Sequence, residues 1–255
     1  MDRLFTKAVE DILTTASQSR AFLASNLAFI FPSGRGPTLF PSWRAVIPNA
    51  HFLTPEPHYS DAHRKDAPYY DPQKDVLIPG YMSYGRMREL LSMSIPVQRR
   101  SLLVSFIGQN HGYVRPRLFD ELNRHQRKDV IAERKVRNYA RVRGNSKFCI
   151  VARGLSSWTL QFFETLWSEC IPLLVNDHYA PPFEDIIDYS FVVRQHELNL
   201  SSLMDTVDAM SDAHIYSLVK LMRAQRCNLS FLHHTCNASI NIAEHLARKH
   251  HLKSS

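Results

Sequence analysis

The sequence lacks any segment that could cross a membrane as a helix. No apolar run approaches the ~20 residues needed to span a bilayer, and the longest one, over residues 21–32, is interrupted by Ser25 and Asn26. The first twenty residues contain acids and no apolar core of a secretory signal peptide. Internal repeats and low-complexity tracts are also absent, which excludes a solenoid or another repeat architecture.

Cysteine and metal-binding motifs are scarce. None of the four cysteines forms a C-x-x-C pair, which argues against a zinc site or a redox motif. An even count permits two disulfides, but the simplest expectation for Cys149 and Cys170, which flank one strand–helix–strand unit, is two buried free thiols. The histidines form no H-E-x-x-H pattern and the acids after residue 176 show no D-x-D spacing, so no metal site and no cofactor are predicted.

Positive charge is concentrated in one segment. The net charge is +7, and residues 113–147 hold 11 Lys or Arg against 4 Asp or Glu, so the rest of the chain is close to neutral. Such a block attracts phosphates, nucleic acid or an anionic polysaccharide, or it forms a solvated helix face with i,i+4 ion pairs. No nucleic-acid-binding motif or aromatic platform accompanies it, so nucleic acid is the weakest of these partners.

The apolar and charged fractions are ordinary for a globular protein and argue against disorder. Short apolar runs predict strands at residues 27–31, 50–53, 75–78, 102–107, 148–151, 171–175 and 191–193. Helices are predicted over residues 1–20, 83–94, 114–127, 129–143 and 157–169, and then near 200–210 and over 213–250 with a break around Asn228. This alternation indicates mainly parallel sheets covered on both faces, in two domains, residues 1–95 and 96–255.

The stretch from residue 146 to residue 188 carries most of the candidate chemistry. A turn, Ala152-Arg153-Gly154, follows a predicted strand and precedes a predicted helix. Ligands of open α/β sheets lie at such strand ends, where the helix N-terminus favours phosphate, Arg153 can add a bidentate contact and Gly154 permits close approach. Gly108 follows another strand and precedes a helix bearing Arg115, which fits the same role. Both segments are also compatible with ordinary surface turns.

Glu164 is a carboxylate on a largely apolar helix. It belongs to a narrow polar stripe with Gln161 and Ser168, at helical spacing. Burying the carboxylate without a partner costs several kcal/mol, so it needs donors. Sugar hydroxyls and an internal Arg or Lys both meet that need.

Asp177 and His178 follow the strand predicted at residues 171–175 and lie at the same sheet edge. Histidine has a near-neutral pKa, so His178 is a candidate acid or base, as well as an ordinary surface residue. No residue is assigned as the catalytic base, for which Asp177 and His178 are the only candidates named.

Three N-glycosylation sequons, at Asn199, Asn228 and Asn237, favour the lumen of the secretory pathway. Because no signal peptide is present, we expect the natural protein to have a further N-terminal portion.

Several motifs recur in an order that matches a known family. They are Lys74-Asp75-Val76 with Ile78-Pro79, Phe106-Ile107-Gly108 with Val114-Arg115, Ser146-Lys147-Phe148-Cys149, Arg153-Gly154, an aromatic-rich helix with Trp158 and Glu164, Cys170-Ile171-Pro172, Asn176-Asp177, and Pro182-Phe183 with Asp188. Over roughly residues 25–195 the chain resembles the exostosin family of glycosyltransferases (family 47, GT-B fold).

The resemblance implies an inverting transfer from a nucleotide sugar, usually UDP-linked, to a glycan or glycoprotein acceptor. It implies two Rossmann-like domains, with the N-terminal one short or truncated here and the donor held by the C-terminal one. Glu164 would bind the donor ribose, Arg153 and Gly154 would face the diphosphate, and Gly108, Arg115 and Asp177 would complete the substrate site. The family also implies the Golgi or endoplasmic reticulum lumen and a membrane anchor outside this chain.

Three positions depart from the family pattern. Asn110 and Gln161 stand where many members have arginine, and Glu169 replaces the glycine that usually precedes Cys-Ile-Pro. Two missing cations near a diphosphate favour a second hypothesis, a glycosyltransferase-like protein that binds a nucleotide or glycan, or assists a partner subunit, without turnover. The short N-terminal domain is also compatible with a fragment.

Overall fold

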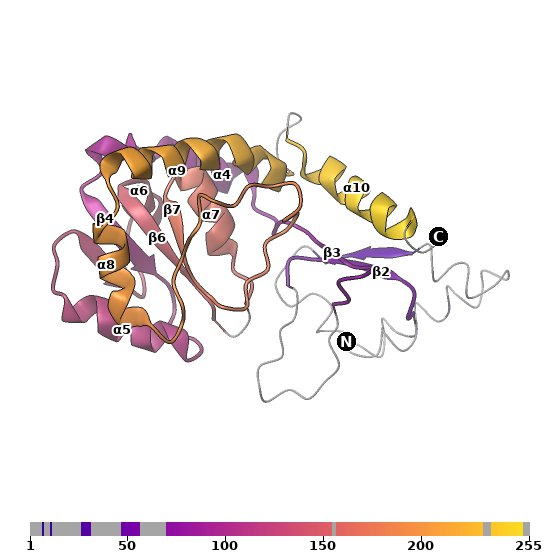
Figure 1. The fold of residues 1–255 in the computed structure, drawn as a ribbon, viewed down its shortest axis with the longest axis horizontal. Coiled ribbons are helices and arrows are strands. Elements are labelled where there is room, and N and C mark those ends of the chain that lie inside the picture. Colours follow the sequence, from indigo (N-terminus) through magenta and orange to yellow (C-terminus); the bar gives the residue numbers. More distant parts are fainter. Residues whose placement is uncertain are drawn as a thin grey trace. The chain divides into compact units, whose positions relative to one another are not determined.

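The computed structural model describes residues 27–31, 47–56, 70–154, 157–231 and 236–251, together with Lys7 and Asp11. The chain divides into two compact units, drawn in Figure 1. The first comprises Met1–Gly80, Ala180–Phe183 and Ala238–Ser255, and the second comprises Tyr81–Tyr179 and Glu184–Asn237. The helix predicted over residues 1–20 lies outside the described residues, apart from Lys7 and Asp11.

The first unit contains a sheet of three parallel strands in the order β1-β2-β3, at Ala28–Ile30, His51–Thr54 and Val76–Leu77. These confirm the strands predicted at residues 27–31, 50–53 and 75–78. The ring of Phe52 packs edge-on against Phe31 at 5.4 Å and Phe29 at 6.2 Å, which supplies much of this small core. Apolar packing on one face therefore sets the position of these short strands.

A buried carboxylate fastens the ends of this sheet. Asp75 accepts hydrogen bonds from the backbone N–H of Phe52 at 2.8 Å and of Asp71 at 2.7 Å. Backbone donors satisfy the charge that burial would otherwise penalise. The Lys74-Asp75-Val76 motif thus has a structural role in holding β2 next to β3.

The C-terminal helix α10, Ala238–His251, belongs to the first unit and runs beside β3 (Figure 1). Lys249 donates to the carbonyl oxygens of Pro72, at 2.8 Å, and Asp75, and His245 lies against the ring of Phe183 at 5.1 Å. The units therefore differ from the predicted domains 1–95 and 96–255. The division falls after Gly80, and the chain returns to the first unit at its end, because α10 finds its contacts there.

The second unit contains a five-stranded parallel sheet in the order β5-β4-β6-β7-β8. Its strands are β4 (Leu102–Ile107), β5 (Val130–Glu133), β6 (Ser146–Ala152), β7 (Ile171–Val175) and β8 (Val193–Arg194). Its helices are α4 (Tyr84–Ser92), α5 (Val114–Arg124), α6 (Tyr139–Gly144), α7 (Leu160–Ser168), α8 (Leu203–Asp208) and α9 (Asp212–Gln225), with 3₁₀ turns η2 (Val97–Arg99), η3 (Leu200–Ser202) and η4 (Arg226–Leu229).

Helices cover this sheet on both faces. The chain moves from β4 to β5 in one direction and from β6 to β7 in the other, so right-handed crossovers place α5 and α7 on opposite faces. The interior strand β7 is buried throughout, as expected for a parallel strand between two helical layers. The predicted α/β class with parallel sheets is confirmed, and two such units agree with the predicted GT-B type.

One predicted helix is wrong. Residues 129–143 form the edge strand β5 and the short helix α6, because Val130 and Ile131 pair with Val104 and Ser105 of the interior strand β4. Two adjacent β-branched residues favour a strand. Helix α7 also begins later than residue 157, with Thr159 as its N-cap through a hydrogen bond from the Gln161 N–H.

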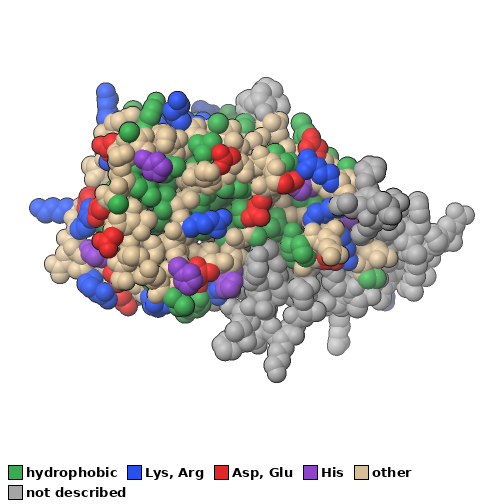
Figure 2. Space-filling view, in the orientation of Figure 1, with side chains coloured by type: hydrophobic (Ala, Val, Ile, Leu, Met, Phe, Trp, Pro, Cys, Tyr) green, Lys and Arg blue, Asp and Glu red, His purple; other side chains and the backbone are tan. Residues whose placement is uncertain are grey.

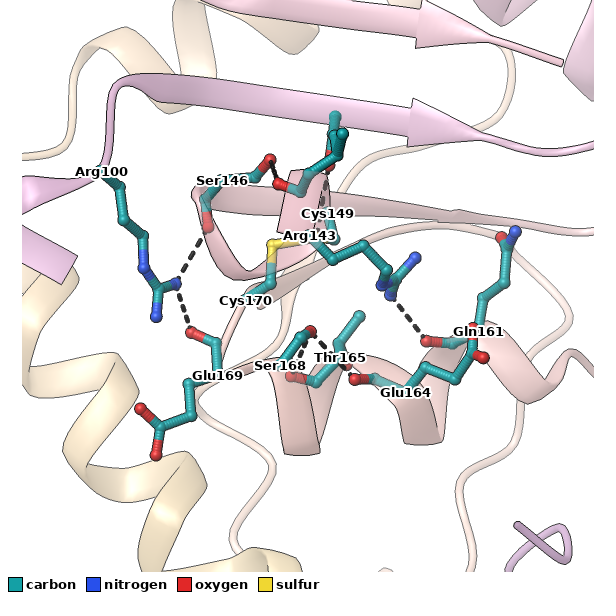
Figure 3. The surroundings of a disulfide bond; sticks show 12 residues. Arg100, Arg143, Ser146, Cys149, Gln161, Glu164, Thr165, Ser168, Glu169 and Cys170 are labelled. Carbon is teal, nitrogen blue, oxygen red and sulfur yellow. Dashed lines mark hydrogen bonds between the residues drawn. A yellow bond between two sulfur atoms is a disulfide. The ribbon is translucent and has the colours of Figure 1, made fainter. Parts of the chain in front are cut away.

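The expectation of free thiols is also wrong. Cys149 on β6 and Cys170, which precedes β7, form a disulfide between neighbouring strands, shown in Figure 3. Cys227 and Cys236 form a second one. The β6–β7 register brings Cys149 opposite Pro172, so the residues are in reach only because these two strands are neighbours.

A cluster of ion pairs lies at the amino ends of the strands of the second sheet. Glu169 lies between α7 and β7 and accepts from Arg223 at 2.7 and 2.5 Å and from Arg226 at 3.1 Å. Its own carbonyl accepts from Arg100, which also donates to the Ser146 carbonyl (Figure 3). This cluster joins α9 to the strand ends opposite the candidate site.

Candidate functional site

The order of the strands creates a crevice at the carboxyl edge of the second sheet. The chain leaves β4 for β5 on one side and then returns past β4 to form β6 on the other. Parallel sheets bind ligands outside the carboxyl ends of strands where the order reverses in this way. The turns that follow β4 and β6 contain Gly108 and Arg153-Gly154, so the structure brings these predicted residues together.

Arg115 joins the two turns. Its guanidinium donates to the carbonyl oxygens of Gln109, at 3.1 Å, Ala152, at 3.1 Å, and Arg153, at 3.2 Å. Burial lowers the pKa of Arg115, although the side chain keeps its charge at neutral pH. Arg115 was predicted to touch substrate, but the contacts that it makes here hold the walls of the crevice.

The glycines of both turns give Arg115 its space. A Cβ on Gly108 would lie 3.3 Å from one terminal nitrogen of Arg115, and a Cβ on Gly154 would lie 3.4 Å from the other. Gly112 has a φ of +74°, and a Cβ there would lie 2.5 Å from the carbonyl oxygen of Gly154. The close approach that requires these glycines is thus made within the protein itself.

A cavity of about 520 Å³ opens beside this crevice. It lies at the carboxyl ends of β4 and β5 and reaches the first residues of α7, whose N-terminal N–H groups favour an anion. Its size is that of small-molecule sites. It is lined by Ile107, Gly108, Gln109, His111, Arg115, Arg134, Lys135, Val136, Tyr139, Thr159, Leu160 and Gln161.

Two cations at this cavity were not singled out from the sequence. Arg134 and Lys135 directly follow β5, are exposed, and form no hydrogen bond or ion pair with any residue that the structure describes. They were missed because the segment was predicted as a helix, in which no strand end precedes them. The β-branched pair Val130-Ile131 was the available signal.

The other Lys and Arg residues of the basic segment 113–147 are not gathered in one place. Arg143 is buried, Arg127 pairs with Asp129 and Asp208, and Lys147 pairs with Asp212. On the face drawn in Figure 2, Lys and Arg side chains are interspersed with Asp, Glu and His. The block therefore contributes individual residues to different places.

Glu164 is buried, and each of its carboxylate oxygens accepts a hydrogen bond from a residue of the second unit. One carboxylate oxygen accepts from Arg86 at 2.9 Å and the other accepts from the Tyr139 hydroxyl at 2.5 Å. Burial lowers the pKa of Arg86, but the charge and hydrogen bonds of Glu164 and Glu89 outweigh it and raise the pKa overall. Burial also raises the pKa of Tyr139, which stays a hydroxyl donor. Tyr139 lines the cavity whereas Glu164 does not.

Gln161, one of the departures from the family pattern, forms part of the cavity wall. Its side-chain nitrogen donates to the Ile107 carbonyl at 2.5 Å, and its backbone carbonyl accepts from Arg143 at 3.0 Å (Figure 3). Its side-chain oxygen is buried and has no hydrogen-bond partner among the residues that the structure describes. The cavity wall thus offers one acceptor to a ligand donor.

Arg153 and Asp177 belong to a second cluster, around Glu197. The buried Glu197 carboxylate accepts from the Tyr113 hydroxyl and from the Asp177 N–H at 3.1 Å, and it lies 3.9 Å from the Arg153 Nε. The Arg153 guanidinium lies over the ring of Tyr113 at 5.0 Å. His196 contacts the Asp177 carboxylate at 3.2 Å. Neither Arg153 nor Asp177 lines the cavity, although Arg115 connects Arg153 to it.

Metal and membrane features complete the description. Within the described part of the chain, no group of three or more His, Cys, Asp or Glu side chains is arranged to hold a metal ion. Of the described helices, none combines the length and apolar character needed to cross a bilayer.

Comparison with known proteins identifies the family. The model of the exostosin GT47 domain matches residues 37–210, which is more than half of the chain. The chain belongs to the exostosin GT47 family. The crevice, the cavity and the clusters around Glu164 and Glu197 fall within the matched residues of this GT47 domain.

The relatives are longer proteins. The chain is 27% identical to the probable glycosyltransferase At5g03795 of Arabidopsis thaliana over 72% of this chain and 40% of that protein. It is 33% identical to the probable arabinosyltransferase ARAD1 of the same plant over 46% of this chain and 27% of that protein. The crystal structure of TarM covers 82% of this chain and 53% of its own, with 8% identity and a TM-score of 0.48. The GT47 chain therefore matches less than half of the length of these curated relatives.

Proposed function

We propose that this chain is the donor-binding part of an inverting glycosyltransferase that moves a sugar from a UDP-linked donor to a glycan or glycoprotein acceptor. One observation carries the proposal: a GT47 domain holds a cavity at the carboxyl edge of its parallel sheet, beside the point where the strand order reverses, with two cations that bind no described residue. A diphosphate fits this chemistry, since it needs positive charge and N–H donors together.

In the proposed reaction the acceptor hydroxyl attacks the anomeric carbon from the face opposite the diphosphate. The new glycosidic bond forms as the bond from the anomeric carbon to the diphosphate oxygen breaks, and a general base takes the hydroxyl proton. Arg134, Lys135 and the N-terminus of α7 stabilise the charge on the departing nucleoside diphosphate. Asp177 and His178 stay candidates for the base and are not assigned further.

The predicted site residues divide into two roles under this proposal. Gly108, Arg115 and Gly154 shape the crevice, since their contacts are with one another. Arg153 and Asp177 approach the ligand from the Glu197 cluster. A ribose contact of Glu164 would add to or replace the bond from Tyr139, whose hydroxyl already donates to one carboxylate oxygen.

Calorimetric titration of UDP into the full chain tests whether the cavity binds the donor nucleotide. Loss of two charge-assisted contacts of ~1.5 kcal/mol each predicts that Arg134→Ala with Lys135→Ala weakens UDP binding about 100-fold. Arg137→Ala removes one positive charge from the same segment outside the cavity lining and should change the affinity less than about threefold. Equal losses in both variants, or no UDP binding at all, would overturn the site.

A second pair of variants tests Glu164. If the ribose binds Glu164 directly, Tyr139→Phe releases a carboxylate oxygen and leaves UDP affinity unchanged or tighter, whereas Glu164→Ala weakens it. If both variants weaken binding equally, Glu164 acts only by holding Tyr139 in the cavity wall. No loss in Glu164→Ala would remove this residue from the site.

The location and the alternative function remain part of the proposal. Two disulfides and three sequons support the lumen of the endoplasmic reticulum or Golgi, where thiols oxidise, with a membrane anchor in the full-length protein.

The alternative, a binding or partner protein without turnover, is favoured by Gln161 in the cavity wall, where the family often has arginine. Release of UDP from a UDP-sugar by the full-length protein separates the two functions, since only an enzyme turns over.

A further inference from the structure

Two of the three sequons lie in contrasting structural settings. Asn199 lies between β8 and η3, and both Asn199 and Ser201 are exposed. The Ser201 hydroxyl donates to the Asn199 side-chain oxygen at 3.3 Å. No residue in the described ranges accepts a hydrogen bond from the Asn199 side-chain nitrogen. The atom that would be glycosylated is therefore accessible, and so is the hydroxyl that completes the motif.

Asn228 has the opposite setting. Its side-chain nitrogen donates to Gln225 at 3.2 Å, and its oxygen accepts from the Asn237 side chain at 3.3 Å. Ser230, the hydroxyl residue of this sequon, is only 5% exposed. The segment begins at the Cys227–Cys236 disulfide. Glycosylation of Asn228 would require this folded and cross-linked segment to open.

We propose that Asn199 is an N-glycosylation site of this protein and that Asn228 is not. In the transfer, a lipid-diphosphate-linked oligosaccharide is the co-substrate. A bond forms between the Asn199 side-chain nitrogen and the anomeric carbon, the bond from that carbon to the diphosphate breaks, and the nitrogen gives up one proton. The inference rests on the luminal location included in the proposed function.

A groove beside the sequon fits the first sugars of such a glycan. It has a volume of about 260 Å³ and lies between α5 and η3, and Ser201 is part of its wall. Arg117, Asp120 and Arg124 offer charged partners for sugar hydroxyls, and Leu198, with 69% of its surface exposed, offers an apolar contact. A glycan on Asn199 would cover this leucine. The remaining lining residues are Glu121 and Leu200.

The full chain, directed to the secretory lumen of a eukaryotic cell by a cleavable leader, tests the acceptor site. Glycopeptide mass spectrometry after amidase treatment in ¹⁸O-water should show an occupied Asn199 and an unoccupied Asn228. One glycan should disappear from the intact mass in Asn199→Gln and Ser201→Ala and persist in Ser201→Thr and Asn228→Gln. An unoccupied Asn199, or an occupied Asn228, would overturn the proposal.

Two further measurements separate its parts. Protection of the native protein from added protease in intact vesicles reports the luminal location independently, so its failure refutes that part of the proposed function without affecting acceptor competence. For the groove, amidase should release the Asn199 glycan from folded protein several-fold faster in Asp120→Ala than in Asp205→Ala, which removes an equal charge from α8 outside the groove. Equal rates would show that the sugars do not lie there.

Discussion

Replacement of Glu169 should reveal two opposing contributions at one position. Glu169 ends α7 in the left-handed region, with φ 53° and ψ 28°, where a side chain costs ~1–2 kcal/mol relative to glycine. Glu169 as a residue is 7% exposed, and its carboxylate binds Arg223 and Arg226. The backbone conformation explains why the family usually has glycine here, and the ion pairs explain how this chain tolerates glutamate.

The magnitudes follow from these contacts. Removing one partner of a buried ion pair costs ~3–5 kcal/mol, and an exposed pair is worth ~0–1 kcal/mol. The side chains of Arg223 and Arg226 are 42% and 21% exposed, so Glu169→Ala should lower the free energy of unfolding by about 2 kcal/mol, between these limits. Glu169→Gly loses the same pairs but relieves the backbone, so it should be about 1 kcal/mol more stable than Glu169→Ala.

Urea unfolding of the three proteins, monitored by circular dichroism, measures both differences. A glycine variant no more stable than the alanine variant would refute the left-handed strain. An alanine variant as stable as the parent would refute the contribution of the ion pairs. A double-mutant cycle with Arg223→Ala isolates the coupling energy between Glu169 and Arg223. This energy should account for most of the stability lost in Glu169→Ala, since Arg223 supplies two of the hydrogen bonds to Glu169.

Three further outcomes are expected. Gly112→Ala places a Cβ against the carbonyl oxygen of Gly154 and should weaken UDP binding at least tenfold by calorimetry, whereas Gly85→Ala, with no atom within 4 Å of the new Cβ, should not; equal affinities would contradict the packing argument. Cys149→Ala opens a disulfide that spans 21 residues and should cost about 3 kcal/mol in urea unfolding, and a loss below 1 kcal/mol would argue against the bond. Burial raises the pKa of Glu169, but Arg223 outweighs it and lowers the pKa below its ordinary value of 4.5. The resulting stability is present above pH 4.5 and is lost as the pH falls through the folded-state pKa. The free energy of unfolding should therefore fall less steeply below pH 4.5 in Glu169→Gln than in the parent protein. Equal slopes in the two proteins would refute this.

Local sequence patterns were sufficient to predict most strands and the glycine turns. The run of Leu102–Ile107 ends at Gly108, and β6 ends before Arg153-Gly154, as apolar patterning and turn residues indicated. The segment after Asp129 was predicted wrongly because its charged residues fit a helix face, while its pairing with β4 depends on a strand more than twenty residues earlier.

The candidate site was only partly accessible from the sequence. The polar stripe on α7 indicated that Glu164 needed a donor, and both a sugar and an internal cation satisfied that requirement. The cation in the structure is Arg86, 78 residues away, and a sequence pattern of helical period cannot select a partner at that distance. Arg134 and Lys135 became cavity residues only once β5 placed them at a strand end.

The sequence by itself determined the alternation of strands and helices, the turn positions and, through the order of its motifs, the exostosin resemblance, because each of these depends on residues close together in the chain. The tertiary structure decided which residues meet: Arg115 with both turns, Cys149 with Cys170, and Tyr139 rather than Glu164 at the cavity. These contacts follow from the strand order β5-β4-β6-β7-β8, which packing of the whole sheet and its helices selects.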